Sequence, residues 1–226
     1  MLSSARNNKA SRALVHMRAP IAIGGFKVVY GGEYVDGERD GQQCVLKHFL
    51  AGSVVDEAFF AAEMGLIARA LKIVHAFNVH RILDTRVWLN VPAIWTVESG
   101  WGRDDGEKAL VEPRITAFRK FNSNTGWTCR DADAMQALSH FSYHDSNGCV
   151  LLCDLQGAAM KHGYVLTDPV IMSPGRHYGP TDLGRRGIST FFARHVCRRF
   201  CSPDWIRPAD RNVYFDAVEG STMQRI

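Results

Sequence analysis

The stretch Gly148-Cys-Val-Leu-Leu-Cys-Asp-Leu-Gln-Gly157 joins an apolar run to an abruptly polar end. The apolar residues predict a short buried strand that ends at Asp154, beside a glycine that lets another backbone approach closely. Residues 164–168 predict a second, shorter strand, and Asp168 ends it within Leu166-Thr-Asp-Pro169. Two carboxylates therefore end two predicted strands.

These strand ends allow two interpretations. Carboxylate oxygens and the Gln156 amide oxygen are ligands that Mg²⁺ prefers, so Asp154, Gln156 and Asp168 suit a catalytic or metal site. Asp also commonly ends strands and begins turns, so both aspartates are equally explained as turn formers. The residues alone leave both interpretations open.

The first half of the chain contains a second candidate site. Residues 21–35 give two β-prone runs around Gly24-Gly25, and Lys47 lies inside the strand-like residues 43–49. A Gly-rich turn offers backbone N–H groups to phosphate and the lysine offers a positive charge, as in kinase nucleotide sites.

Glu63 is the expected partner of Lys47. It falls on the apolar face of a predicted helix, where a lysine would reduce the cost of burying the carboxylate. The helix is predicted from a capping box at Ser53 and Asp56 and from apolar residues at helical spacing: Val55, Phe59, Leu66, Ala70, Val74 and Phe77. The alternative is a solvent-facing lysine and an amphipathic-helix glutamate, which is the commoner situation for each residue separately. No Walker pattern accompanies the glycines.

Further strands are predicted at residues 86–91 and 93–97, and helices at residues 134–143 and 186–199. Strands, then a helix, then a mixed half predict an α+β fold rather than a regularly alternating doubly wound sheet.

Three potential metal ligands lie within seven residues: His195, Cys197 and Cys201. A fourth ligand would complete the tetrahedral shell that structural Zn²⁺ prefers. Cys149 and Cys153 lie in an apolar strand and are also explained as small buried side chains. The candidates for the fourth ligand are Cys149, Cys153, His140 and His144.

Composition restricts the class of protein. The chain has 226 residues, 46% hydrophobic and 22% charged, which predicts a folded globular protein. A net charge of +4 does not argue for a nucleic-acid partner, and no apolar run approaches the roughly 18 to 20 residues of a membrane span. With no signal peptide and six cysteines that we interpret as thiols or metal ligands, we expect a cytoplasmic protein without membrane or nucleic-acid partners.

Taken in order, the motifs resemble the catalytic domain of the alpha-kinase family, atypical protein kinases that include myosin heavy chain kinases, elongation-factor-2 kinase and channel-kinases. The resemblance runs from about residue 10 to residue 205. After the Gly-Gly hairpin it rests on Val45-Leu-Lys47, Val111-Glu-Pro113, Lys120-Phe-Asn-Ser-Asn124, Gln136-Ala-Leu-Ser-His140-Phe141, Cys153-Asp-Leu-Gln-Gly157, Leu166-Thr-Asp-Pro169, Gly179-Pro-Thr-Asp-Leu-Gly184 and His195-x-Cys197-x₃-Cys201.

The resemblance implies a two-lobed, protein-kinase-like fold that fills residues 1–226 as one catalytic domain. Its β-rich N-lobe would cover about 10–110, its mixed, zinc-stabilised C-lobe about 115–205, and a tail 206–226. Members transfer the γ-phosphate of ATP to Ser or Thr of a protein substrate, with Mg²⁺. The sequence identifies neither that substrate nor the oligomeric state.

The resemblance also implies roles for individual residues. Lys27 and Lys47 would lie at the ATP phosphates, with Glu63 holding Lys47 and Glu112 in the hinge near adenine. Asp154 would be the catalytic base, and Gln156 and Asp168 would bind Mg²⁺. The implied zinc ligands are His140, His195, Cys197 and Cys201.

Three departures from the family pattern mark this chain. Residues 114–118 lack the usual Gly-Glu pair, residues 158–166 are a few residues longer than usual, and Ile67 stands near an expected glutamine. Lys47, Asp154, Gln156 and Asp168 are all present, which favours an active kinase. The alternative is a catalytically inactive alpha-kinase-like binding module. A zinc hydrolase is disfavoured, because four protein ligands leave zinc no open position for water.

Overall fold

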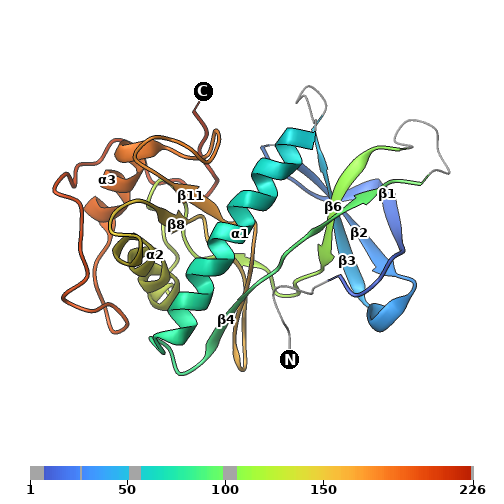
Figure 1. Cartoon of the computed structure of the whole chain (residues 1–226), viewed down its shortest axis with the longest axis horizontal. Coiled ribbons are helices and arrows are strands. Elements are labelled where there is room, and N and C mark those ends of the chain that lie inside the picture. The colour runs from blue at the N-terminus through green and yellow to red at the C-terminus, as the bar shows by residue number, and fades with distance from the viewer. Residues whose placement is uncertain (1–7, 26, 51–56, 99–105, 225–226) are drawn as a thin grey trace. The chain divides into compact units, whose positions relative to one another are not determined.

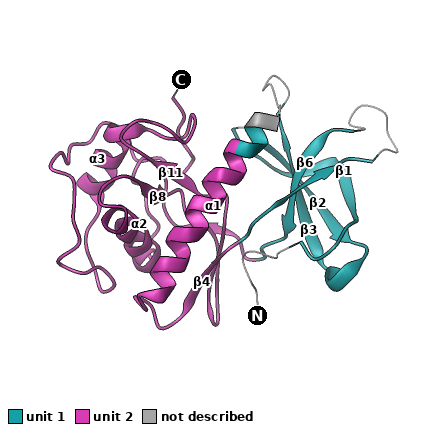
Figure 2. Ribbon diagram, viewed as in Figure 1, with its two compact units in different colours: residues 1–61, 90–116 teal, residues 62–89, 117–226 magenta. Residues whose placement is uncertain are grey.

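A computed structural model describes residues 8–25, 27–50, 57–98 and 106–224 (Figure 1). The chain divides into two compact units (Figure 2). Unit 1 comprises residues 1–61 and 90–116, and unit 2 comprises residues 62–89 and 117–226. Residues 62–89, from the first half of the chain, thus belong to the same unit as residues 117–226.

Unit 1 is an antiparallel five-stranded sheet in the order β1-β2-β3-β6-β5. Successive side chains of a strand point to opposite faces. Cys44 and Leu46 of β3 therefore join the core on one face, whereas Lys47 lies on the other. The strands are β1 (Ala13–Ile23), β2 (Lys27–Tyr34), β3 (Gln43–Phe49), β5 (Ala93–Thr96) and β6 (Lys108–Pro113), with a 3₁₀ turn at Gly37–Arg39.

The helix α1 (Glu57–Val79) contributes residues to both units. Ala70, Val74 and Phe77 are buried at helical spacing, as the apolar periodicity predicted, whereas Leu66 is half-buried and its neighbour Ile67 is buried. Phe77 packs edge-on against Phe141 within unit 2, with ring centroids 5.4 Å apart. The predicted capping box at residues 53–56 lies outside the described residues.

Unit 2 contains a four-stranded sheet, a two-stranded sheet and two helices. The larger sheet has the order β4-β10-β9-β7, and β8 pairs with β11 in the smaller one. Only the β4–β10 pairing among these is parallel. The elements are β4 (Arg86–Leu89), β7 (Arg119–Lys120), α2 (Asp133–Asp145), β8 (Leu151–Cys153), β9 (Gln156–Met160), β10 (Gly163–Thr167), β11 (Val170–Met172) and α3 (Gly184–Arg194).

The strands predicted at 86–91 and 93–97 exist, but they join different sheets. β5 pairs with β6 in unit 1, whereas β4 pairs with β10 in unit 2. The Asn78 side chain donates to the Val87 carbonyl (2.7 Å) and accepts from the Val87 N–H (2.9 Å), so an amide of α1 satisfies the free edge of β4. Because β4 and β5 are close in sequence, the sequence did not indicate that they join different sheets.

The mixed helix and strand content confirms the α+β prediction, with two local differences. The last helix ends at Arg194 rather than residue 199, because His195 adopts an extended conformation. β9 occupies residues that we expected to form a loop, whereas β10 lies where a strand was predicted, and the second residue of β9 has to be glycine. A Cβ on Gly157, at φ +149°, would lie 1.9 Å from the Val165 carbonyl oxygen.

Candidate functional site

In unit 1, Lys47 forms a buried ion pair. Its Nζ lies 2.9 Å from Glu112 Oε1, and the two residues are 3% and 2% exposed. Lys47 is opposite Leu110 and Glu112 is opposite Val45, so the pair runs diagonally across β3 and β6 on one face of the sheet. Two buried charges this close offset much of each other's desolvation cost.

The other residues predicted to contact the nucleotide site are Lys27 on β2 and Glu63 on α1. Lys27 begins β2, opposite Phe49, with Nζ 5.3 Å from the centre of the Phe49 ring. Glu63 is half-buried in the part of α1 that belongs to unit 2. The structure places the Glu112 carboxylate, for which the resemblance implies a role near adenine, against Lys47.

In unit 2, Asp154 is the corner between β8 and β9. It is 1% exposed and has φ +58°, a left-handed conformation that Asp tolerates better than most residues. Lys120 Nζ lies 2.8 Å from Oδ1, and the Ser221 hydroxyl donates to Oδ2 at 2.6 Å. Burial raises the pKa of Asp154, while Lys120, Ser221 and the Asn124 backbone N–H act to lower it.

Asp168 forms the matching corner between β10 and β11. It too is left-handed, with φ +45°. Cys153 pairs with Val170 and Gln156 with Thr167, so the two corners lie between neighbouring antiparallel segments. The Gln156 amide N–H donates to the Asp168 carbonyl at 3.3 Å. The structure therefore brings together the two strand ends that the sequence identified, and positive φ at both is typical of strain held at functional sites.

Asn122 and Lys120 support the Asp154 corner. The buried Asn122 accepts from the Leu155 N–H at 2.9 Å and donates to Gln136 (2.8 Å) and Ser139 (3.0 Å). It thereby anchors the residue after Asp154 to α2. Lys120 and Asn122 belong to a motif that entered the sequence analysis only through the family resemblance, and no role was assigned to either residue. An isolated Lys or Asn forms no pattern from which a role could be predicted.

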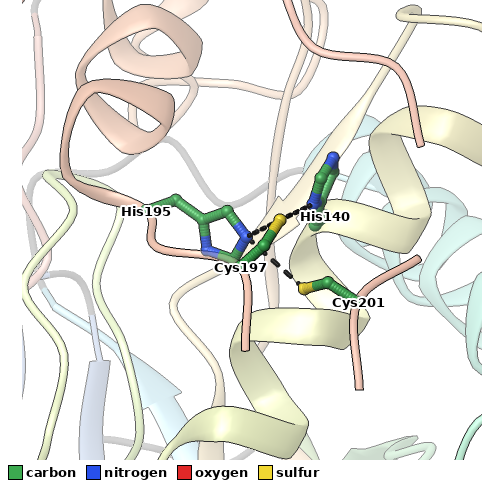
Figure 3. A group of neighbouring side chains, drawn as sticks. All are labelled: His140, His195, Cys197 and Cys201. Carbon is green, nitrogen blue, oxygen red and sulfur yellow. Dashed lines mark hydrogen bonds between the residues drawn. The ribbon is translucent and has the colours of Figure 1, made fainter. Parts of the chain in front are cut away.

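A second site in unit 2 gathers His140 from α2 with His195, Cys197 and Cys201 from the segment after α3 (Figure 3). One ligand atom from each residue lies within 4.8 Å of all the others. Cys197 Sγ is 3.3 Å from His140 Nδ1 and 3.5 Å from His195 Nε2, and Cys201 Sγ is 3.6 Å from His195 Nε2. Among the candidates for the fourth position, the structure selects His140.

The surroundings of this cluster favour metal ligation. Burial lowers the pKa of His140 and of His195 to about 4, so both imidazoles are neutral near pH 7. The second nitrogen of His140 lies 3.1 Å from the Ile206 carbonyl, an arrangement that orients metal-binding histidines. Arg207 donates to Cys197 Sγ at 2.9 Å.

None of the helices in the described ranges is both long and apolar enough to cross a membrane. The cytoplasmic location remains a prediction.

A sequence profile of the alpha-kinase family matches residues 22–201. The chain is 39% identical over 87 residues to alpha-protein kinase vwkA of Dictyostelium discoideum, and 36% identical over 109 residues to eukaryotic elongation factor 2 kinase of Mus musculus. These alignments cover 37% and 46% of this chain, and 14% of each relative. The chain thus matches a small part of each relative's length.

Solved structures share the fold. An alpha kinase from Entamoeba histolytica has a TM-score of 0.73 at 22% identity, covering 94% of this chain and 85% of that one. The alpha-kinase domain of myosin-II heavy chain kinase A in complex with AMP-PNP has a TM-score of 0.72 at 21% identity, covering 84% and 85%.

The buried Lys47–Glu112 pair predicts an asymmetric response to mutation. Lys47→Met leaves the Glu112 carboxylate buried without this cation, and should therefore lower the free energy of unfolding by about 3–5 kcal/mol. Lys47→Met combined with Glu112→Gln should recover most of that loss, because no charge is then buried. Urea unfolding of the three proteins measures the effect. Equal stability of the single and double variants would contradict the buried pair.

Proposed function

Because the chain belongs to the alpha-kinase family, we propose that it is a protein kinase that transfers the γ-phosphate of ATP to serine or threonine, with Mg²⁺. One observation carries this proposal. The buried Asp154 carboxylate, paired with Lys120, accepts a hydrogen bond from a serine hydroxyl at 2.6 Å. A kinase base holds the hydroxyl of its substrate in this way before accepting its proton.

The raised pKa of Asp154 supports its role as the base. Burial disfavours the charged carboxylate, so Asp154 is a better proton acceptor than an exposed aspartate. Lys120 opposes this shift, because its positive charge favours the ionised carboxylate. Proton transfer from the attacking hydroxyl to Asp154 then accompanies bond formation to the γ-phosphorus.

For the nucleotide, we assign Lys47 and Lys27 to the ATP phosphates. Glu112 fixes the Lys47 ammonium in the sheet, in addition to the adenine-side role that the resemblance implies. The resemblance also implies that Glu63 holds Lys47. A lysine held in this way offers a pre-positioned charge, so little ordering is required when the phosphates bind.

We assign Mg²⁺ to Gln156 and Asp168. Oxygen donors suit this hard cation. The Gln156 amide N–H donates to the Asp168 carbonyl, which leaves the amide oxygen available to the cation. Bound Mg²⁺ neutralises charge on the phosphates. The fold contributes by placing these two oxygen donors at adjoining strand ends.

We further propose that His140, His195, Cys197 and Cys201 bind one structural zinc. Bonds of about 2.0–2.3 Å in a tetrahedron place neighbouring ligand atoms about 3.6 Å apart. The 3.3, 3.5 and 3.6 Å separations fit that geometry. Two thiolates balance the charge of Zn²⁺, and four protein ligands close its shell.

Removing the base and removing the metal ligand should have different effects. Asp154→Asn should lower the rate of transfer to a Ser/Thr peptide library by about 10² to 10⁴, with no rescue by added Mg²⁺. Asp168→Ala should raise the Mg²⁺ requirement, and saturating Mg²⁺ should restore part of the rate. The measurement is a Mg²⁺ titration of the initial rate with radiolabelled ATP.

The exposed Asp131→Asn is the matched control and should behave as wild type. Phosphoamino-acid analysis of the product separates serine and threonine from tyrosine. Rescue of Asp154→Asn but not Asp168→Ala would reverse the two roles. Failure of the wild-type chain to transfer phosphate would leave the inactive binding module as its function.

The zinc proposal predicts one zinc per chain in metal analysis of the purified protein. Cys201→Ser should abolish zinc binding and cause unfolding or aggregation, because binding energy at a closed site stabilises the fold. Cys149→Ser is the matched control, because Cys149 is exposed and lies outside the cluster. Wild-type protein that is folded, stable and free of zinc would refute the assignment.

A further inference from the structure

The serine that contacts Asp154 belongs to residues 216–224, here called the Ser221 segment. Side chains and backbone of unit 2 anchor this segment on both sides of Ser221. Before it, Thr125 Oγ1 donates to the Val218 carbonyl at 3.2 Å and accepts from its N–H at 3.1 Å. After it, Asn124 accepts from the Thr222 N–H at 2.9 Å and donates to its carbonyl at 2.7 Å.

A third anchor follows. The Gln224 N–H donates to the Pro180 carbonyl at 3.0 Å, and Arg176 donates to the Gln224 carbonyl at 3.3 Å. The segment has no regular secondary structure, so these contacts to the backbone fix its position. Hydrogen bonds to the backbone hold a segment whatever its side chains are, which is how an enzyme holds an extended peptide.

The Ser221 hydroxyl lies between two charged groups. It donates to Asp154 Oδ2 at 2.6 Å, and Lys120 Nζ donates to its oxygen at 3.4 Å. Ser221 is exposed as a residue, although its hydroxyl contacts a carboxylate that is 1% exposed. The proton of the hydroxyl therefore points at the proposed base, and its oxygen faces a cation.

A simpler explanation of this contact would be that the Ser221 hydroxyl only satisfies the buried Asp154 carboxylate. Lys120 and the Asn124 N–H already provide Asp154 with a cation and a hydrogen bond, so stability does not require a further donor. A serine hydroxyl aimed at the base and held by anchors on either side has the arrangement of a bound substrate.

We propose that Ser221 is an intramolecular phosphorylation site of the Asp154 centre. This inference rests on the proposed kinase function. In the transfer, the Ser221 Oγ–H proton passes to the Asp154 carboxylate while a bond forms between Oγ and the γ-phosphorus of ATP. The bond from that phosphorus to the β–γ bridging oxygen breaks, and ADP leaves with the electron pair.

Phosphorylation changes the balance of charge at the site. Phosphoserine brings a charge of about −1.5 to −2 beside the Asp154 carboxylate, and Lys120 supplies one positive charge. The resulting repulsion drives residue 221 away from Asp154, so the modification is followed by release of the segment.

The test follows radiolabelled phosphate on chains first treated with a phosphatase, with Mg·ATP and with a Ser/Thr peptide library in a parallel arm. Mass spectrometry should locate the first phosphate on Ser221. The rate per chain should not change with chain concentration, because the target is held within the same molecule. Ser221→Thr should be phosphorylated on threonine, whereas Thr222→Ala, the neighbouring control, should still acquire phosphate on Ser221.

Mixing separates transfer within a chain from transfer between chains. Asp154→Asn chains incubated with active Ser221→Ala chains should gain no phosphate on Ser221. Labelled peptides with unlabelled Ser221, or a Ser221 rate that rises with chain concentration, would overturn the proposal and leave the kinase function standing. No transfer to either the peptides or the chain would refute both.

Discussion

The burial of the Asp154 carboxylate at a left-handed corner is the constraint on which unit 2 depends. A buried carboxylate is costly unless a cation and hydrogen-bond donors surround it, and the left-handed backbone adds strain. Lys120 and the Asn124 N–H meet the first cost. Pairing of the strands on either side of the corner meets the second.

The metal cluster and the Asp154 corner are connected through α2. His140 faces the cluster, and two residues later Ser142 accepts from the Leu152 N–H of β8 at 2.7 Å. Leu152 lies two residues before Asp154. A zinc ion that fixes α2 to the segment after α3 would therefore also steady the strand that precedes Asp154.

Local patterns predicted most of the secondary structure. Apolar runs located β3, β8 and β10, and the helical spacing of Ala70, Val74 and Phe77 located α1. They failed for β9, because its sequence Gln-Gly-Ala-Ala-Met has small residues and no clear alternation. They also failed to separate β4 from β5, because the choice of sheet depends on a long-range pairing with β10 that no local residue encodes.

The candidate site was predictable to a similar extent. Asp154 and Asp168 stand out because polar residues end apolar strands, and the His195 to Cys201 spacing suggests a metal. The selection of His140, the pairing of Lys47 with Glu112 and the approach of Ser221 to Asp154 join residues 57, 65 and 67 positions apart. Such contacts follow from the tertiary fold, and a single sequence contains no local signal for them.

The pH dependence of kcat tests the role of Asp154 most directly. Activity requires the ionised carboxylate, so it should be complete above the pKa of Asp154 and fall as the pH drops through that pKa, which burial holds above the usual aspartate range. Lys120→Met removes the cation that lowers this pKa, and should move the acid limb of the profile to higher pH. Arg119→Met, which removes the adjacent exposed cation, should leave the limb in place. An acid limb that does not move in Lys120→Met, or that moves to lower pH, would contradict Asp154 as the base.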